Sequence, residues 1–254
     1  MIQFTAFPEL HNADQDGLLA MGGDLSVNTL VSAYSQGIFP WFNEGQPILW
    51  WAPDPRLVLY PNQFKISRSL KRNIKNKYDV TCNRAFSEII SGCALRGGPE
   101  INATELDALD NSPNTHLDDE PQETTWITKA MHQAYIELHN TGYAHSIETW
   151  QDGELVGGLY GVCLGKVFFG ESMFSRKPDA SKAALAYLCQ HLANQEFKLI
   201  DCQVASEHLF SLGAIEIPRS EFIAALNDID INQPNLGFSK NFPDNPTDLT
   251  HYFS

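Results

Sequence analysis

A strand pattern changes into a helix pattern at residues 170–182, which read GESMFSRKPDASK. Upstream, residues 155–169 are apolar and aromatic with interspersed glycines, which predicts two strands joined by a tight turn. Downstream, apolar residues recur at helical spacing as far as Leu192, and Asp179 or Ser181 can cap the helix. We interpret the polar segment between them as a strand-to-helix loop, which is either an ordinary connection or part of a binding site.

The surrounding pattern predicts a mixed α/β fold. From residue 126 the expected order is helix, strand, hairpin strands, helix, strand, helix and strand, before a last helix that runs to Leu226. Hairpins join antiparallel neighbours, so a mixed sheet fits this order better than a doubly wound parallel sheet.

We expect three parts along the chain. A small N-terminal α/β domain covers residues 1–65, a larger domain covers residues 66–232, and a tail with little pattern covers residues 233–254. Within the larger domain, residues 97–124 carry several carboxylates and prolines without periodicity, which predicts a mobile acidic loop.

Charge is distributed unevenly along the chain. The net charge of -14 argues against nucleic acid only if it is averaged over the whole molecule. Residues 65–84 contain seven Lys or Arg and one Asp, and Ser67 can cap a helix with one basic face, formed by Arg68, Lys71, Arg72 and Lys75. Since no carboxylates interleave with these cations, the face is either solvated surface or a contact for phosphates.

Several classes of protein are excluded by what the sequence lacks. Residues 1–10 show neither the basic run nor the apolar core of a secretion signal, and no apolar run approaches the length of a membrane span. We therefore expect a cytoplasmic protein that does not enter a membrane. The five cysteines form no CxxC pair and the eight histidines form no HExxH motif, so we expect reduced thiols and no metal.

Nine short motifs stand out along the chain: GGDL (22–25), GIFPW (37–41), WWAPDPR (50–56), SRSL (67–70), WIT (126–128), AHSIE (144–148), GGLYG (157–161), GESMFS (170–175) and IDCQ (200–203). In this order, from about Phe4 to about Leu226, they resemble the bacterial leucyl/phenylalanyl-tRNA-protein transferases. The last two motifs together are the most specific part of the resemblance.

The resemblance implies a fold and a reaction. The larger domain would be related to the GNAT acyltransferase fold, but would act on aminoacyl-tRNA instead of acyl-CoA. The enzyme, a leucyltransferase, would move Leu or Phe from Leu-tRNA or Phe-tRNA to proteins with an N-terminal Arg or Lys, marking them for degradation by the N-end rule. The preference among Leu, Phe and Met stays open. No cofactor is implied, and we expect a monomer.

The resemblance also implies roles for particular residues. Asp201 and Gln203 match the positions of the catalytic relay. The pocket for the aminoacyl group and the terminal adenosine would be formed by Trp51, Trp126, Leu159, Phe168, Glu171 and Ser175. The tRNA stem would be contacted by Arg68, Lys71, Arg72 and Lys75.

The chemistry of these residue types fits aminolysis of an ester, which needs alignment of two substrates, a proton acceptor and stabilisation of the oxyanion. The carbonyl of Gln203 can hold the attacking amine, but an amide is too weak a base to keep the proton. The proton would pass to Asp201, to water or to the departing ribose hydroxyl. Glu171 is a candidate contact for the ammonium group of the donor or of the acceptor.

Two other functions compete with this interpretation. A CoA-dependent acetyltransferase of the GNAT type would need a glycine-rich pyrophosphate loop, and residues 175–181 contain no glycine. A non-catalytic module that binds tRNA or protein N-termini would need only the aromatic pocket and the basic helix.

Overall fold

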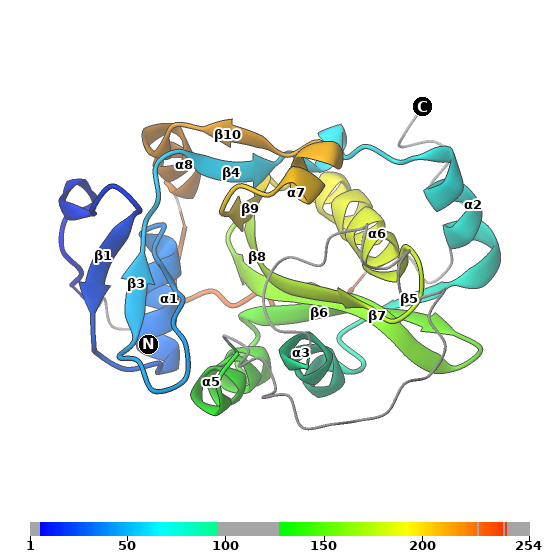
Figure 1. The fold of residues 1–254 in the computed structure, drawn as a ribbon, viewed down its shortest axis with the longest axis horizontal. Coiled ribbons are helices and arrows are strands. Elements are labelled where there is room, and N and C mark those ends of the chain that lie inside the picture. The colour runs from blue at the N-terminus through cyan, green and yellow to red at the C-terminus, as the bar shows by residue number, and fades with distance from the viewer. Residues whose placement is uncertain (1–5, 96–126, 228, 241, 243–254) are drawn as a thin grey trace, which may run out of the picture.

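A computed structural model of the chain describes residues 6–95, 127–227, 229–240 and 242. In these ranges the chain forms a three-stranded sheet and a seven-stranded sheet, with helices packed around them (Figure 1). The acidic loop expected over residues 97–124, the pocket residue Trp126 and most of the expected tail lie outside the described residues. Within the described ranges, no helix is long and apolar enough to cross a membrane.

The small sheet lies near the N-terminus and is antiparallel, in the order β1-β3-β2. Its strands are β1 (Leu18–Met21), β2 (Phe39–Pro40) and β3 (Leu49–Trp51). Helix α1 (Val27–Ser35) follows β1, and the Ser26 side chain caps it by accepting a hydrogen bond from the Thr29 amide. The Trp50 indole donates to the Gly22 carbonyl oxygen at 2.8 Å and fixes the sheet to the turn before α1.

The large sheet is mixed, as the sequence predicts. Its order is β10-β4-β9-β8-β7-β6-β5, and every pair of neighbours is antiparallel except β8 and β9. The strands are β4 (Arg56–Leu59), β5 (Asp79–Cys82), β6 (Ala144–Gln151), β7 (Glu154–Leu164), β8 (Val167–Ser175), β9 (Leu199–Gln203) and β10 (Ile215–Ile217). The parallel pair is possible because helix α6 (Ala180–Asn194) crosses over between β8 and β9.

Two apolar cores lie on the two faces of the large sheet. Helices α6 and α2 (Arg68–Lys77) pack on one face (Figure 1). The other face is covered by α1, α3 (Phe86–Ala94), α5 (Lys129–Asn140) and α8 (Arg219–Leu226). The short helix α7 (Glu207–Ser211) follows β9, and two single 3-10 turns occur at Leu10–Asn12 and Pro61–Gln63.

Two sequence interpretations need correction. The segment at residues 170–175 is not a loop, because β8 continues to Ser175 and pairs with β7 through Leu159 with Met173 and Gly157 with Ser175. The polar side chains of this segment do not give it the sequence pattern of a strand, because they face a cavity and a helix N-terminus instead of an apolar core. Strand β1 was not predicted because four apolar residues carry no alternation.

The expected domain boundary after residue 65 stays a prediction. Strand β4 lies before it in the chain and yet belongs to the large sheet, between β9 and β10. The small sheet with α1 therefore forms the compact N-terminal part, and the chain enters the large sheet at Arg56.

Candidate active site

A cavity of about 420 Å³ is lined by residues 39–41 of the N-terminal part, by strands β7, β8 and β9, and by helices α6 and α7. Most of its wall is apolar or aromatic, formed by Phe39, Pro40, Trp41, Leu159, Tyr160, Phe168, Met173, Leu185, Leu188, Ile200, Val204 and Leu209. Its polar groups include Glu171, Ser172, Gln203, Ser206 and His208. An apolar pocket with a few convergent polar groups is the usual form of a small-molecule site.

Glu171 and Gln203 make the polar end of this cavity. The Gln203 side-chain amide donates to Glu171 Oε1 at 2.9 Å, so its carbonyl oxygen is turned away from Glu171. Tyr34 also donates to Oε1 at 2.8 Å, and the Tyr135 hydroxyl lies 2.7 Å from Oε2. Burial raises the pKa of Glu171 to about 7, with a further rise from Asp201, against the lowering effect of the three hydrogen bonds.

Behind Gln203 lies a fully buried ion pair. The guanidinium of Arg56 donates to both carboxylate oxygens of Asp201, at 2.8 Å from Nε and 2.7 Å from Nη2, and neither side chain is exposed. The rings of Phe39 and Phe222 lie on the guanidinium, with centroids at 4.7 and 4.6 Å. The pair therefore joins β4 to β9, and an aromatic residue from each of β2 and α8 packs on it.

The pair also sets the conformation of Gln203. Its backbone amide donates to Asp201 Oδ1 at 2.9 Å, and its φ of 66° lies in the left-handed region. Alternation along residues 198–204 predicts that Asp201 and Gln203 point to one face of the strand and Cys202 to the other. The structure differs, because the positive φ of Gln203 interrupts the regular alternation of β9. Gln203 lines the cavity beside Cys202, whereas Asp201 points into the buried pair.

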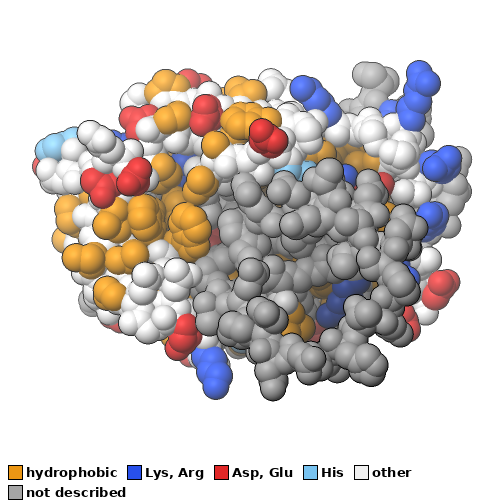
Figure 2. Space-filling view, viewed as in Figure 1, with side chains coloured by type: hydrophobic (Ala, Val, Ile, Leu, Met, Phe, Trp, Pro, Cys, Tyr) orange, Lys and Arg blue, Asp and Glu red, His pale blue; other side chains and the backbone are white. Residues whose placement is uncertain are grey.

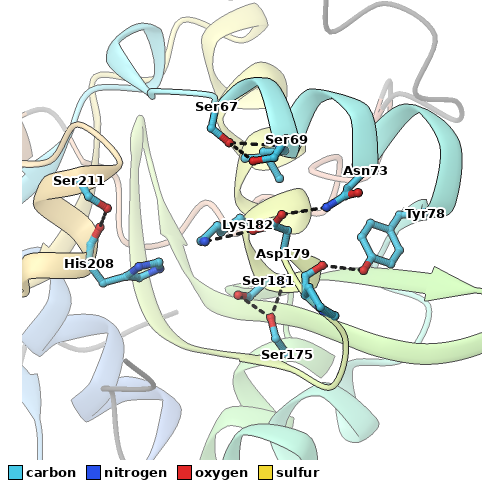
Figure 3. Close-up of polar contacts among 12 residues, drawn as sticks. Ser67, Ser69, Asn73, Tyr78, Ser175, Asp179, Ser181, Lys182, His208 and Ser211 are labelled. Carbon is cyan, nitrogen blue, oxygen red and sulfur yellow. Dashed lines mark hydrogen bonds and ion pairs between the residues drawn. The ribbon is translucent and has the colours of Figure 1, made fainter. Parts of the chain in front are cut away.

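The structure brings together four of the residues expected at the site: Leu159, Phe168, Glu171 and Gln203 all line the cavity. Trp51 lies next to it, since its indole donates at 2.7 Å to the carbonyl oxygen of Trp41, a cavity residue. Ser175 lies elsewhere, at the start of α6, where its hydroxyl accepts from the Ser181 amide and donates to the Ser181 hydroxyl, both at 2.8 Å (Figure 3).

The basic helix expected over residues 67–75 is present as α2. Ser67 caps it by accepting from the Leu70 amide, which confirms the predicted cap. Arg68 and Arg72 are exposed and Lys71 is half-buried, whereas the side chain of Lys75 is outside the described part of the structure. Figure 2 shows Lys and Arg side chains gathered at the end of the molecule where α2 lies.

Helix α2 is tied to the start of α6, next to the cavity. Asn73 of α2 donates to Asp179 at 2.9 Å, and Lys182 donates to the same carboxylate at 3.0 Å (Figure 3). His208, a cavity residue of α7, points toward this junction from the other side (Figure 3). Burial, and then the neighbouring Lys182 charge, lower the pKa of His208, which keeps it neutral near pH 7.

Sequence reasoning missed four residues of the site. Arg56 and Tyr160 stand in the WWAPDPR and GGLYG motifs, but neither they nor Tyr34 and Tyr135 are predicted as site residues from the sequence. Tyr160 lines the cavity, and its hydroxyl is buried without a hydrogen-bond partner among the described residues. Among these residues only Arg56 has a signal in the sequence. It is a charged residue at the start of an apolar strand, and a charged side chain that is buried there must be paired.

The arrangement suits a reaction at an uncharged acyl group. The apolar wall can hold a hydrophobic side chain, the Gln203 carbonyl can accept from an amine, and Glu171 can exchange a proton near neutral pH. In the described ranges no three His, Cys, Asp or Glu side chains gather as metal ligands would.

Comparison with known proteins identifies close relatives. The family model for the leucyl/phenylalanyl-tRNA protein transferase matches residues 58–104 and 114–227, and the model for its N-terminal domain matches residues 23–54. The leucyl/phenylalanyl-tRNA-protein transferase of Nitrosomonas eutropha is 51% identical over 89% of this chain and 88% of its own length. That of Syntrophobacter fumaroxidans is 52% identical over 87% and 86%. The structure of L-PGS from Bacillus licheniformis shares 14% identity with a TM-score of 0.32 over 67% of this chain and 48% of that one, a similarity too low to bear on function.

The buried ion pair generates a stability prediction. Arg56→Met should lower the free energy of unfolding by about 3–5 kcal/mol, because it leaves the Asp201 carboxylate buried without its partner. The double substitution Arg56→Met with Asp201→Leu should recover most of that loss, since no unpaired charge remains. Urea unfolding of both variants measures this, with the exposed Arg176→Met as the control that should change little. A double variant no more stable than the single one would contradict the role given to the pair.

Proposed function

The chain belongs to the leucyl/phenylalanyl-tRNA protein transferases, and we propose that it moves Leu or Phe from charged tRNA to the α-amino group of an N-terminal Arg or Lys. It is an aminoacyltransferase whose substrates are an aminoacyl-tRNA and a protein. Leu-tRNA and Phe-tRNA are the proposed donors, a monomer in the cytoplasm is the proposed state, and degradation by the N-end rule is the proposed fate of the acceptor.

The observation that carries this proposal is an apolar cavity that ends in Gln203 and Glu171. A leucyl or phenylalanyl side chain would lie against Leu159 and Phe168, where a charged side chain would lose its hydration without compensation. The reacting ester would then lie near the polar end.

The acceptor amine would be held by Gln203. Because the amide of this side chain already donates to Glu171, its carbonyl oxygen remains to accept a hydrogen from the incoming amine. Asp201 would act only indirectly. Its two carboxylate oxygens already accept hydrogen bonds from Arg56 and from the Gln203 backbone amide, and its side chain does not line the cavity. We therefore propose that Asp201 positions Gln203 and is not the group that accepts the proton of the amine.

The basic face would hold the tRNA. Arg68, Lys71 and Arg72 lie on α2, and the contact of Asn73 with Asp179 fixes this helix beside the cavity. The acceptor stem would lie along α2, and the single-stranded end would pass the start of α6 and His208 into the cavity. The strong acidity of the rest of the chain would then favour a cationic protein N-terminus.

The start of α6 argues against a CoA-dependent enzyme. Acyl-CoA enzymes of the rival type would bind a pyrophosphate on free backbone amides at such a helix start. Here the backbone amide of Ser181 already donates a hydrogen bond to the Ser175 hydroxyl, and the carboxylate of Asp179 lies at the same helix end. Both features disfavour an anion at this position.

A transfer assay tests the function. Leucine should pass from Leu-tRNA to a peptide that begins with Arg and not to the same peptide beginning with Ala. Gln203→Ala should lower the rate by about 100-fold or more because the attacking amine loses its acceptor. The exposed Gln63→Ala should not change the rate. Binding of tRNA without transfer would instead favour the non-catalytic module, and acetylation of the peptide from acetyl-CoA would favour the acetyltransferase.

The tRNA path makes a separate prediction. Arg68→Gln and Arg72→Gln should each weaken Leu-tRNA binding and reduce the slope of log affinity against log salt by about one, because each removes one phosphate contact. Lys129→Gln is the control, as an exposed cation on α5 at the opposite face of the sheet. Salt titration of tRNA binding measures the slope, and equal slopes for all three variants would place the tRNA elsewhere.

A further inference from the structure

Glu171 belongs to a closed ring of three oxygen-bearing groups. Tyr34 from α1 lies 2.8 Å from its Oε1, and Tyr135 from α5 lies 2.7 Å from its Oε2. The two tyrosine hydroxyls also contact each other, at 2.5 Å. Tyr34 and Tyr135 have no exposed surface, so water cannot come between the two hydroxyls.

Counting hydrogens shows that the ring needs one more than the tyrosines have. Each hydrogen bond uses one hydrogen, each tyrosine hydroxyl has one, and the ring contains three contacts. If Glu171 were a carboxylate that accepted from both tyrosines, the two hydroxyl oxygens would face each other at 2.5 Å with no hydrogen between them. The amide of Gln203 does not help, because it donates to Oε1 from outside the ring.

A protonated Glu171 fills every contact. Its hydrogen lies on Oε2, since Oε1 already accepts from Gln203. Oε2 then donates to Tyr135, Tyr135 donates to Tyr34, and Tyr34 donates to Oε1. The ring is complete in this state, and it must open between the two tyrosines when Glu171 loses its proton.

The surrounding charges agree with a neutral Glu171. The negative charge of Asp201 on β9 raises the pKa of Glu171, and the positive charge of Arg56 on β4 is paired with that same Asp201 carboxylate. Tyr160 on β7 and Cys93 on α3 are buried, and burial raises the pKa of both groups, so they stay uncharged. Burial likewise raises the pKa of Tyr34 and Tyr135. No unpaired cation therefore faces the ring from α1, α3, α5, β4, β7 or β9 in the described structure.

We propose that Glu171 is a neutral carboxylic acid in the resting enzyme and carries the proton of the transfer reaction, with Tyr34 and Tyr135 as the residues that position it. This inference rests on the proposed function. The neutral amine attacks the ester carbonyl carbon, the C–N bond forms, and the bond from carbon to the ribose oxygen breaks with its electron pair on that oxygen. Glu171 gives its proton to the ribose oxygen and takes one from the nitrogen, so it ends as it began.

The protonated state is tested by infrared spectroscopy of the full chain. At about pH 6, where most carboxyl groups are ionised, the protein should show the carbonyl band of a buried carboxylic acid. The band should disappear as the pH is raised through about 7 and should be absent in Glu171→Gln. A wild-type protein without such a band at about pH 6 would overturn the proposal. If Glu171→Gln does not fold, Tyr34→Phe should shift the band, because the carbonyl oxygen loses that donor.

Glu148 provides a matched control on β6. It is fully buried, but its two oxygens accept from four donors, the hydroxyls of Thr81 and Ser146 and the amides of Arg84 and Ala85. None of these contacts requires a hydrogen from Glu148. Glu148→Gln should therefore leave the carboxylic acid band in place, and loss of the band in this variant would assign it to the wrong residue.

The linkage of folding to pH gives a second readout. The pKa of Glu171 is raised in the folded state. Between about pH 4.5 and about pH 7, Glu171 therefore carries a proton in the folded chain and has lost it in the unfolded chain. Below that range, this proton makes its full contribution to the free energy of unfolding, and the contribution is lost as the pH rises through the range. Across the range, each added pH unit should raise the equilibrium constant for unfolding by a factor that is up to about tenfold larger in the wild type than in Glu171→Gln. Equal pH dependence would contradict the proposal.

The proton-carrying role is tested by transfer kinetics. Glu171→Gln should lower kcat by about 100-fold or more and leave KM for Leu-tRNA little changed, because the amide fills the same space without giving up a proton. An unchanged kcat in this variant would refute the role while the wild-type enzyme still transfers leucine. Absence of transfer by the wild type would refute the proposed function itself.

Discussion

The ion pair between Arg56 and Asp201 is the interaction on which the rest of the site depends. Both side chains have zero exposure, so neither charge could remain in the interior without the other. The pair holds β4 beside β9, receives aromatic rings from β2 and α8, and fixes the backbone amide of Gln203. It thereby connects the N-terminal part, the large sheet and the group proposed to hold the attacking amine.

The site separates its tasks between different kinds of surface. In the proposed function, the apolar wall of the cavity would select the side chain of the donor, while Gln203 would bind the amine and Glu171 would transfer its proton. Charges are kept away from the reacting groups, since Arg56 and Asp201 cancel and Glu171 is proposed to be neutral. The basic face at α2 lies outside the cavity, where solvent screens it and a polyanion can reach it. Such an arrangement would let tRNA bind by charge and the ester react in an apolar surrounding.

Local features of this structure could be predicted from sequence, and long-range ones could not. The helix α2 and its Ser67 cap depend on neighbouring residues, and the mixed sheet follows from the order of hairpins and helices. In contrast, Arg56 meets Asp201 across 145 residues, and Tyr34 meets Glu171 across 137. The positive φ of Gln203 follows from the Asp201 contact and has no signal in the IDCQ motif itself. Polar residues also hid the end of β8, because a strand that borders a cavity lacks the alternation of a half-buried strand.

The most direct test of this account is the structure of the protein with a leucyl-adenosine in which an amide replaces the reactive ester. The leucyl side chain should lie in the apolar cavity against Leu159 and Phe168, with the acyl group beside Gln203 and Glu171. A leucyl group bound outside this cavity, or one whose acyl carbon lies out of reach of Gln203, would contradict the assignment of the site.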